Sequence, residues 1–154
     1  MSLRSVFVGL LMFISTSLVA NDTVLQVNDA WIPEAPPVAK MHAGYLEVIN
    51  PSDRDINITG ASSDAYKAVE IHQTVTRDGM AKMVRQQALA VPKKGQVRFE
   101  RGGLHLMLMH PKQPIKVGDN VVIQLQTDSG QSLAFTATVK PATLDDHSHH
   151  HHHH

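Results

Sequence analysis

Short runs of alternating apolar and polar residues recur along most of the chain, and no long stretch keeps the 3.6-residue period of a helix. The runs are rich in β-branched residues and are separated by turn pairs such as Asn-Pro, Asp-Gly and Gly-Gly. Strands are expected over residues 24–30, 42–50, 56–62, 68–74, 82–88, 96–100, 104–110, 121–127 and 133–139. Many short strands at this spacing predict an all-β fold, either a sandwich or a partly closed barrel.

The two ends of the chain differ in composition from the middle. Residues 1–20 combine Arg4, an apolar run over residues 6–18 and a small residue at Ala20, which is typical of a secretory signal peptide. We expect cleavage after Ala20, with a retained anchor as the alternative. Residues 145–154 form a polar tail that ends in six histidines resembling a purification tag. Residues 21–144 then have room for one domain with one hydrophobic core.

The composition excludes several kinds of site. The 154 residues include no cysteine, so the chain has no disulfide, thiolate nucleophile or thiolate metal ligand, and a blue-copper site is excluded. The formal net charge is 0 with histidine neutral, so neither nucleic acid nor membrane insertion after signal removal is expected. We find neither a G-x-S-x-G nor an H-E-x-x-H motif, and we do not expect an enzyme.

Methionine and histidine gather in one part of the sequence. Met80, Met83, Met107 and Met109 fall within one thirty-residue stretch, and His72, His105 and His110 lie in or beside it. Thioethers and imidazoles together form a ligand set for Cu(I), because soft sulfur favours the soft monovalent ion. The clustering therefore predicts a Cu(I) site, although methionine is also a common filler of apolar cores.

The segment 104–109 alternates strictly, so on a strand its leucines face one side and His105, Met107 and Met109 the other. His72 alternates in the same way with apolar neighbours, and Met83 follows it beyond the Asp78-Gly79 turn. A hairpin that carries His72 and Met83 could lie against the 104–110 strand. The alternation leaves that pairing open, and packing of these residues in the core is the alternative reading.

The spacing of four residues resembles a known family. Ten residues separate His72 from Met83 and 21 separate Met83 from His105, and His105-Leu106-Met107 completes an H-x10-M-x21-H-x-M pattern. This is similar to the pattern of the periplasmic copper chaperones called PCu(A)C. The similarity extends through segments 30–33, 44–46, 50–51, 69–72 and 104–109, and so covers nearly all of residues 21–144.

The resemblance implies a single cupredoxin-like (Greek-key) β-sandwich or barrel that binds Cu(I) through His72, Met83, His105 and Met107. It implies a monomer in the periplasm of a Gram-negative bacterium. The chaperone would deliver copper to the CuA centre in the copper subunit of cytochrome c oxidase, with a Sco-type thiol protein as partner. A periplasmic copper-resistance or storage carrier with the same site is the alternative function.

Other residues suggest weaker sites. Met80, Met109 and His110 are candidate auxiliary ligands, but packing or surface roles are favoured because the four-residue set is complete without them. The pair Met41-His42 could border the site or form a second one, against the simpler reading of a loop pair. His147, beside two aspartates, could contribute to a weaker Cu(II) site.

Overall fold

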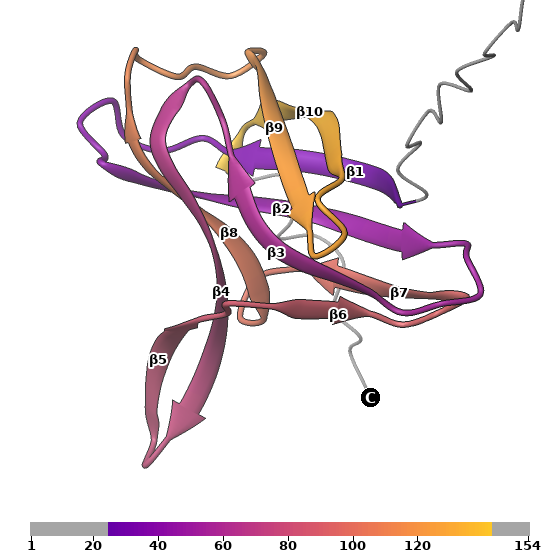
Figure 1. Cartoon of the computed structure of the whole chain (residues 1–154). Coiled ribbons are helices and arrows are strands. Elements are labelled where there is room, and N and C mark those ends of the chain that lie inside the picture. Colours follow the sequence, from indigo (N-terminus) through magenta and orange to yellow (C-terminus); the bar gives the residue numbers. More distant parts are fainter. Residues whose placement is uncertain (1–24, 143–154) are drawn as a thin grey trace, which may run out of the picture.

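The computed structural model describes residues 25–142, and its regular elements are all β-strands (Figure 1). The expected all-β fold is therefore confirmed. Along the chain the strands are β1 (Gln26–Pro33), β2 (Met41–Asn50), β3 (Ile56–Ser62), β4 (Tyr66–Arg77), β5 (Met80–Arg85), β6 (Leu89–Val91), β7 (Gly95–Phe99), β8 (Leu104–Pro111), β9 (Asn120–Thr127) and β10 (Ser132–Lys140). Within residues 25–142 no helix has the length and apolarity needed to cross a membrane. The predicted signal peptide and the tail at 145–154 lie outside the described residues.

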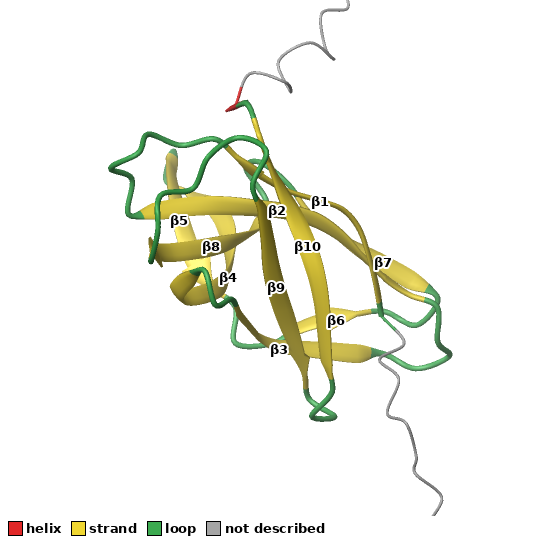
Figure 2. Cartoon of the chain, turned by 90° about the horizontal axis from the view of Figure 1, so that it is seen from above, coloured by secondary structure: helices red, strands yellow, loops and turns green. Residues whose placement is uncertain are grey.

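Seven strands close into a barrel, in the order β4, β8, β2, β1, β10, β9, β3 and back to β4 (Figure 2). The ring closes where Ala61 of β3 pairs with Val69 of β4. Its neighbours are antiparallel except β1 and β10, which run parallel. The remaining strands extend this ring, because β5 pairs with β4, β6 with β3, and β7 with β2. The strands of the described residues therefore enclose a single hydrophobic core.

The period-two alternation of the sequence fills the barrel interior. On β8 the leucines turn inward, and Leu106 and Leu108 have no exposed surface. They pack with residues of the opposite wall such as Ile123 and Leu125, which are also fully buried. The other face of β8, which carries His105 and the two methionines, is consequently turned away from the core.

A hairpin of β4 and β5 projects from the barrel (Figure 1). It turns at Asp78 and Gly79, whose φ angles of 52° and 74° are those of a tight two-residue turn. All six residues of β5 are exposed. Beyond it, the backbone N–H of Gln86 donates to the carbonyl of Ile71 at 2.8 Å, after which the chain leaves β4 and pairs with β3 as β6.

The single strand expected over residues 82–88 was wrong. The two-residue turn lets pairing with β4 begin at Met80, and it ends at Arg85, where the chain changes partner. Residues 82–85 thus belong to β5, residues 86–88 lie in no strand, and the short β6, which pairs with β3, begins only at Leu89.

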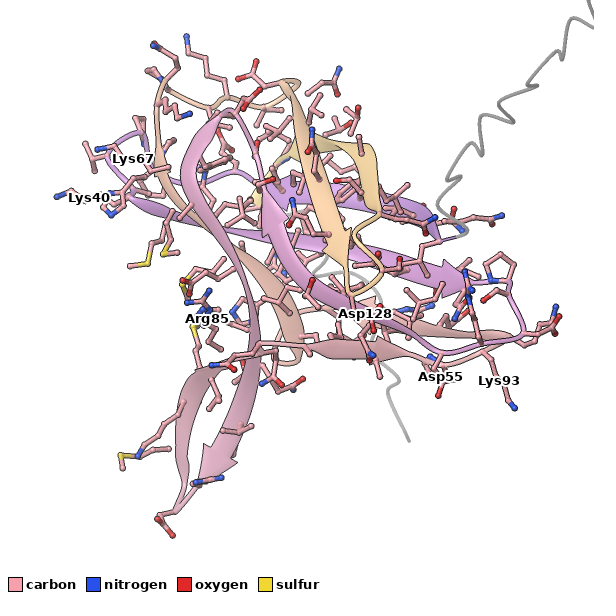
Figure 3. All side chains as sticks on the ribbon, viewed as in Figure 1. Lys40, Asp55, Lys67, Arg85, Lys93 and Asp128 are labelled. Atoms are coloured by element: carbon pink, nitrogen blue, oxygen red, sulfur yellow. The ribbon has the colours of Figure 1, made fainter. Side chains whose placement is uncertain are left out.

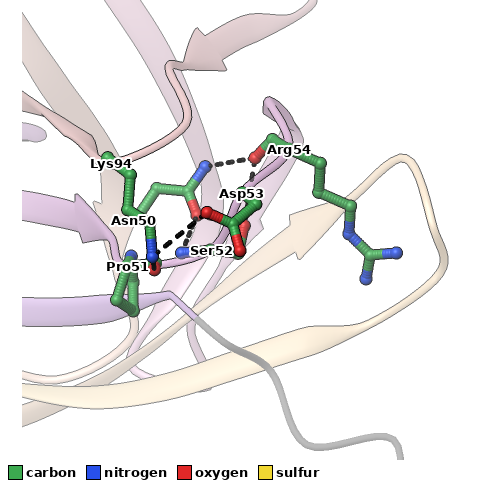
Figure 4. Close-up of polar contacts among 6 residues, drawn as sticks. All are labelled: Asn50, Pro51, Ser52, Asp53, Arg54 and Lys94. Carbon is green, nitrogen blue, oxygen red and sulfur yellow. Dashed lines mark hydrogen bonds and ion pairs between the residues drawn. The ribbon is translucent and has the colours of Figure 1, made fainter.

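The loop between β2 and β3 is held by one fully buried amide, that of Asn50 (Figure 4). Its Nδ2 donates to the carbonyls of Arg54 at 2.8 Å and Val91 at 3.0 Å. Its Oδ1 accepts from the backbone N–H and the hydroxyl of Ser52, at 3.1 and 2.6 Å. Asn50 therefore ties this loop to β6, at the opposite end of β2 from Met41.

Candidate metal site

The antiparallel ladder between β4 and β8 sets His72 directly opposite His105. Directly opposite residues of an antiparallel pair point to the same face, and here the ring centroids lie 6.0 Å apart. The sequence predicted both histidines as ligands, from strands separated by the whole β5–β7 region. The structure brings them together on the outer face of the barrel wall.

The hydrogen bond of His72 leaves one of its ring nitrogens free. Its Nε2 lies 2.9 Å from Oε2 of Glu70, two residues earlier on the same face. A carboxylate only accepts, so Nε2 carries the hydrogen and Nδ1 keeps its lone pair. The second oxygen of Glu70 binds a guanidinium nitrogen of Arg85 at 3.0 Å, which fixes the carboxylate in turn. Figure 3 labels Arg85 at the base of the projecting hairpin.

His105 is arranged in the same way with a backbone partner. Its Nδ1 donates to the carbonyl of Gly103 at 3.1 Å, so the lone pair is left on Nε2. Within residues 25–142, His72 Nδ1 and His105 Nε2 are the buried side-chain nitrogen or oxygen atoms that lack a hydrogen-bond partner. A buried polar atom without a partner is costly, and a metal ion would satisfy both lone pairs.

The two predicted thioether ligands are diagonal neighbours of His72 on this face. Met107 follows His105 on β8 and lies opposite Glu70, and it is partly buried. Met83 lies opposite Thr74 on β5, and 61% of its surface is exposed. Diagonal neighbours are within reach of long side chains, and methionine has three flexible torsions with which to use that reach. All four predicted ligands thus share one face, with the histidines paired and the methionines on either side.

The remaining candidates differ in position. Met109 continues the ligand face of β8, whereas Met80 lies beside the hairpin turn and is 59% exposed. His110 is exposed, with a φ of 53°.

The pair Met41-His42 does not form one site, because the two side chains point to opposite faces of β2. His42 is buried, and its Nδ1 shares a 2.8 Å hydrogen bond with the hydroxyl of Tyr66. Burial lowers the pKa of His42 and raises the pKa of Tyr66 to about 12. His147 lies outside the described residues.

Glu70 is the residue of this cluster that sequence reasoning missed. Its signal was present, because Glu70 and His72 are two residues apart on a strand and must share a face. Arg85 gave no such signal, since its place opposite His72 depends on the register of the β4–β5 hairpin.

Comparison with known proteins places the chain in a family. Residues 25–139 match the sequence profile of the family described as "Putative lipoprotein LpqE-like". A protein of Leifsonia xyli subsp. xyli named "Putative lipoprotein Lxx21020" is 28% identical over 117 residues, covering 75% of this chain and 69% of the relative. The uncharacterised protein RP573 of Rickettsia prowazekii is 33% identical over 82 residues, covering 53% of this chain and 45% of the relative.

Solved structures share the barrel. The structure named CuI-DR1885 from Deinococcus radiodurans is 31% identical, with a TM-score of 0.61 over 82% of this chain and 83% of that one. The copper-bound PCuAC domain from PmoF2 is 19% identical, with a TM-score of 0.65 over 77% of this chain and 94% of that domain. At that identity the second likeness concerns the fold, and both structures extend over most of the domain described above.

Proposed function

We propose that this chain, which belongs to the LpqE-like family and is a cupredoxin-like β-barrel of the PCu(A)C copper chaperone type, is a periplasmic Cu(I) metallochaperone. We propose that His72, Met83, His105 and Met107 hold the ion. The acceptor is the CuA centre in the copper subunit of cytochrome c oxidase, with a Sco-type thiol protein as partner. The structure of CuI-DR1885 from Deinococcus radiodurans and that of the copper-bound PCuAC domain from PmoF2 support the choice of metal.

The observation that carries the proposal is the pair of buried imidazole lone pairs on His72 Nδ1 and His105 Nε2. Each ring is held in the matching tautomer by a second partner, as metal-ligating histidines are. Two imidazoles with neighbouring thioethers favour Cu(I) over a hard cation, which prefers oxygen ligands. The proposed set is neutral, so the bound ion keeps its single positive charge.

Release is proposed to proceed by ligand exchange. Met83 lies on the exposed strand of a projecting hairpin, so an incoming acceptor ligand can reach its side of the ion first. A thiolate binds Cu(I) more strongly than a thioether, and displacement of Met83 would open the site while the histidines and Met107 still hold the ion. Stepwise exchange avoids free copper at any point.

A Cu(I) competition titration against a chromogenic chelator tests the site, with protein lacking the terminal histidines 149–154. Wild type is expected to take one tight Cu(I), and His72→Ala, His105→Ala, Met83→Ala and Met107→Ala are each expected to weaken it. Met80→Ala is the matched control for Met83→Ala, because both methionines lie on β5 with 59% and 61% of their surface exposed. Failure of wild type to compete, or equal binding by all variants, would overturn the proposal.

Histidine ligation also predicts a pH dependence. An imidazole must be unprotonated to bind a metal, so Cu(I) affinity is expected to fall as the pH is lowered from 8 to 5. An affinity that stays flat from pH 8 to pH 5 would count against both histidines.

Delivery requires a separate test in cells. Deletion of the gene is expected to lower cytochrome c oxidase activity at limiting copper, with restoration by wild type but not by the His105→Ala variant. Normal oxidase activity combined with growth sensitive to excess copper would instead support the resistance or storage carrier.

A further inference from the structure

A second group of thioethers lies beside the four-residue site on the same face of the barrel. The ladder between β2 and β8 pairs Met41 with Met109, so the two side chains lie directly opposite each other. Met107 is two residues from Met109 on β8 and shares its face. In Figure 3 sulfur atoms lie between Lys40 and Arg85, over the part of the wall formed by these strands.

The spacing allows the three sulfurs to meet. Directly opposite residues have Cβ atoms about 5 Å apart, and residues i and i+2 on a strand are about 6.6 Å apart. Each methionine can span half of such a gap through its flexible side chain. A set made only of thioethers suits a soft monovalent cation and offers nothing to Mg²⁺ or Ca²⁺.

The surroundings leave room for such an ion. The flanking positions are small, since Ala43 lies beside Met107 on β2 and Ala68 lies beside Met109 on β4. Met41 is 59% exposed, and Met107 and Met109 are partly buried. The exposure of Met41 leaves this group open to solvent from the β2 side.

We propose that Met41, Met107 and Met109 form a second, weaker site for Cu(I), in which Met107 is shared with the site at His72 and His105. The inference rests on the proposed function, because the ion is the same cargo. Sharing one ligand lets the ion move between the sites without leaving the protein: Met107 stays bound while the two histidines replace Met41 and Met109, or the reverse. The thioether group then serves as a holding position at the β2 side of the face.

The experiment uses Ag(I), a redox-stable substitute for Cu(I), and protein without residues 149–154 in which the methionine methyl groups carry ¹³C. In the His72→Ala/His105→Ala variant, one Ag(I) is expected to shift the methyl signals of Met41, Met107 and Met109. The signal of Met80 is expected to stay in place, and it is a matched control because Met80 and Met41 are both 59% exposed. Equal shifts of Met80 and Met41, or no shift of Met41 and Met109 at excess Ag(I), would overturn the proposal.

A second variant separates this proposal from the first. Met41→Leu/Met109→Leu is expected to keep the tight Cu(I) of the histidine site and to lose the second equivalent of Ag(I). If Ag(I) shifts the Met41 and Met109 signals but the wild-type protein takes no tight Cu(I) at its histidines, the four-residue site is rejected and the thioether site is kept. If the histidines bind Cu(I) tightly and the double variant still binds the second equivalent of Ag(I), the thioether site is rejected and the four-residue site is kept.

Discussion

His72 and His105 face each other across the β4–β8 ladder, and the hydrogen-bearing nitrogen of each ring is held by a fixed acceptor. The two acceptors differ in kind. His105 uses a backbone carbonyl, which a side-chain substitution cannot remove, whereas His72 depends on the carboxylate of Glu70. Glu70 is therefore the point at which the preorganisation of the pair can be altered without touching a proposed ligand.

Glu70→Ala is expected to lower Cu(I) affinity about 10-fold while the stoichiometry stays at one ion. Without the carboxylate, His72 loses the partner that fixes its tautomer and ring orientation, and the ion must order the ring itself. The chelator competition titration gives the affinity.

Two further variants distinguish this effect from a general loss of charge. Glu70→Gln keeps an oxygen that can accept from Nε2 and is expected to recover part of the affinity. Glu47→Ala removes another partly buried glutamate that is paired with an arginine, but on β2 beside Arg98, and is expected to leave the affinity unchanged. An affinity of Glu70→Ala equal to that of wild type would show that the carboxylate does not position His72.

Much of the site could be predicted from the sequence because a strand has a side-chain period of two. Alternation alone placed His105 and Met107 on one face of β8 and the leucines in the core, and the structure agrees. The opposition of His72 to His105 could not be derived in that way, since register between distant strands follows from closure of the whole barrel.

The hairpin shows where local reasoning fails. The Asp78-Gly79 pair predicted a turn, but nothing in the sequence predicted that β5 would project with every residue exposed. That property places Met83 at the surface while Met107 stays partly buried. It arises because β4 is longer than the barrel wall that it helps to form, and only β5 pairs with its far end.

The buried pair His42 and Tyr66 predicts a loss of stability in acid. Burial lowers the pKa of His42, so below its ordinary value of 6.5 the unfolded chain takes up a proton that the folded chain does not. The contribution of His42 to the free energy of unfolding is therefore complete above pH 6.5, and it is lost as the pH falls below that value. Denaturant unfolding at pH 7.5 and pH 5.0 measures the difference.

The variant His42→Gln is expected to reduce this acid slope, because it removes the group that titrates. The control His110→Gln changes an exposed histidine and is expected to retain the wild-type slope. A slope unaffected by His42→Gln would mean that other groups cause the acid sensitivity.

Tyr66 predicts a matching loss in alkali. Burial raises its pKa from 10 to about 12, so above pH 10 the unfolded chain releases a proton that the folded chain keeps. Its contribution to stability is complete below pH 10 and is lost as the pH rises from there toward 12. Tyr66→Phe is expected to reduce the decline in the free energy of unfolding measured between pH 9 and pH 11. The control is Tyr45→Phe, at a position on the outer side of β2, and it is expected to decline as wild type does.

Asn50→Ala is expected to lower the free energy of unfolding by about 2 kcal/mol, because the Asn50 amide is fully buried and the carbonyls of Arg54 and Val91 and the hydroxyl of Ser52 would each lose a partner. Asn57→Ala is the control, since the amide of Asn57 makes a single exposed hydrogen bond to Asp128, and we expect it to cost under about 0.5 kcal/mol. Cu(I) affinity is expected to be unchanged in both variants, because Asn50 lies at the end of β2 opposite to Met41 and far from the proposed ligands. Urea unfolding with a chelator titration on the same samples measures both quantities. A loss of copper binding in folded Asn50→Ala would indicate that the loop and the site are coupled through the barrel wall.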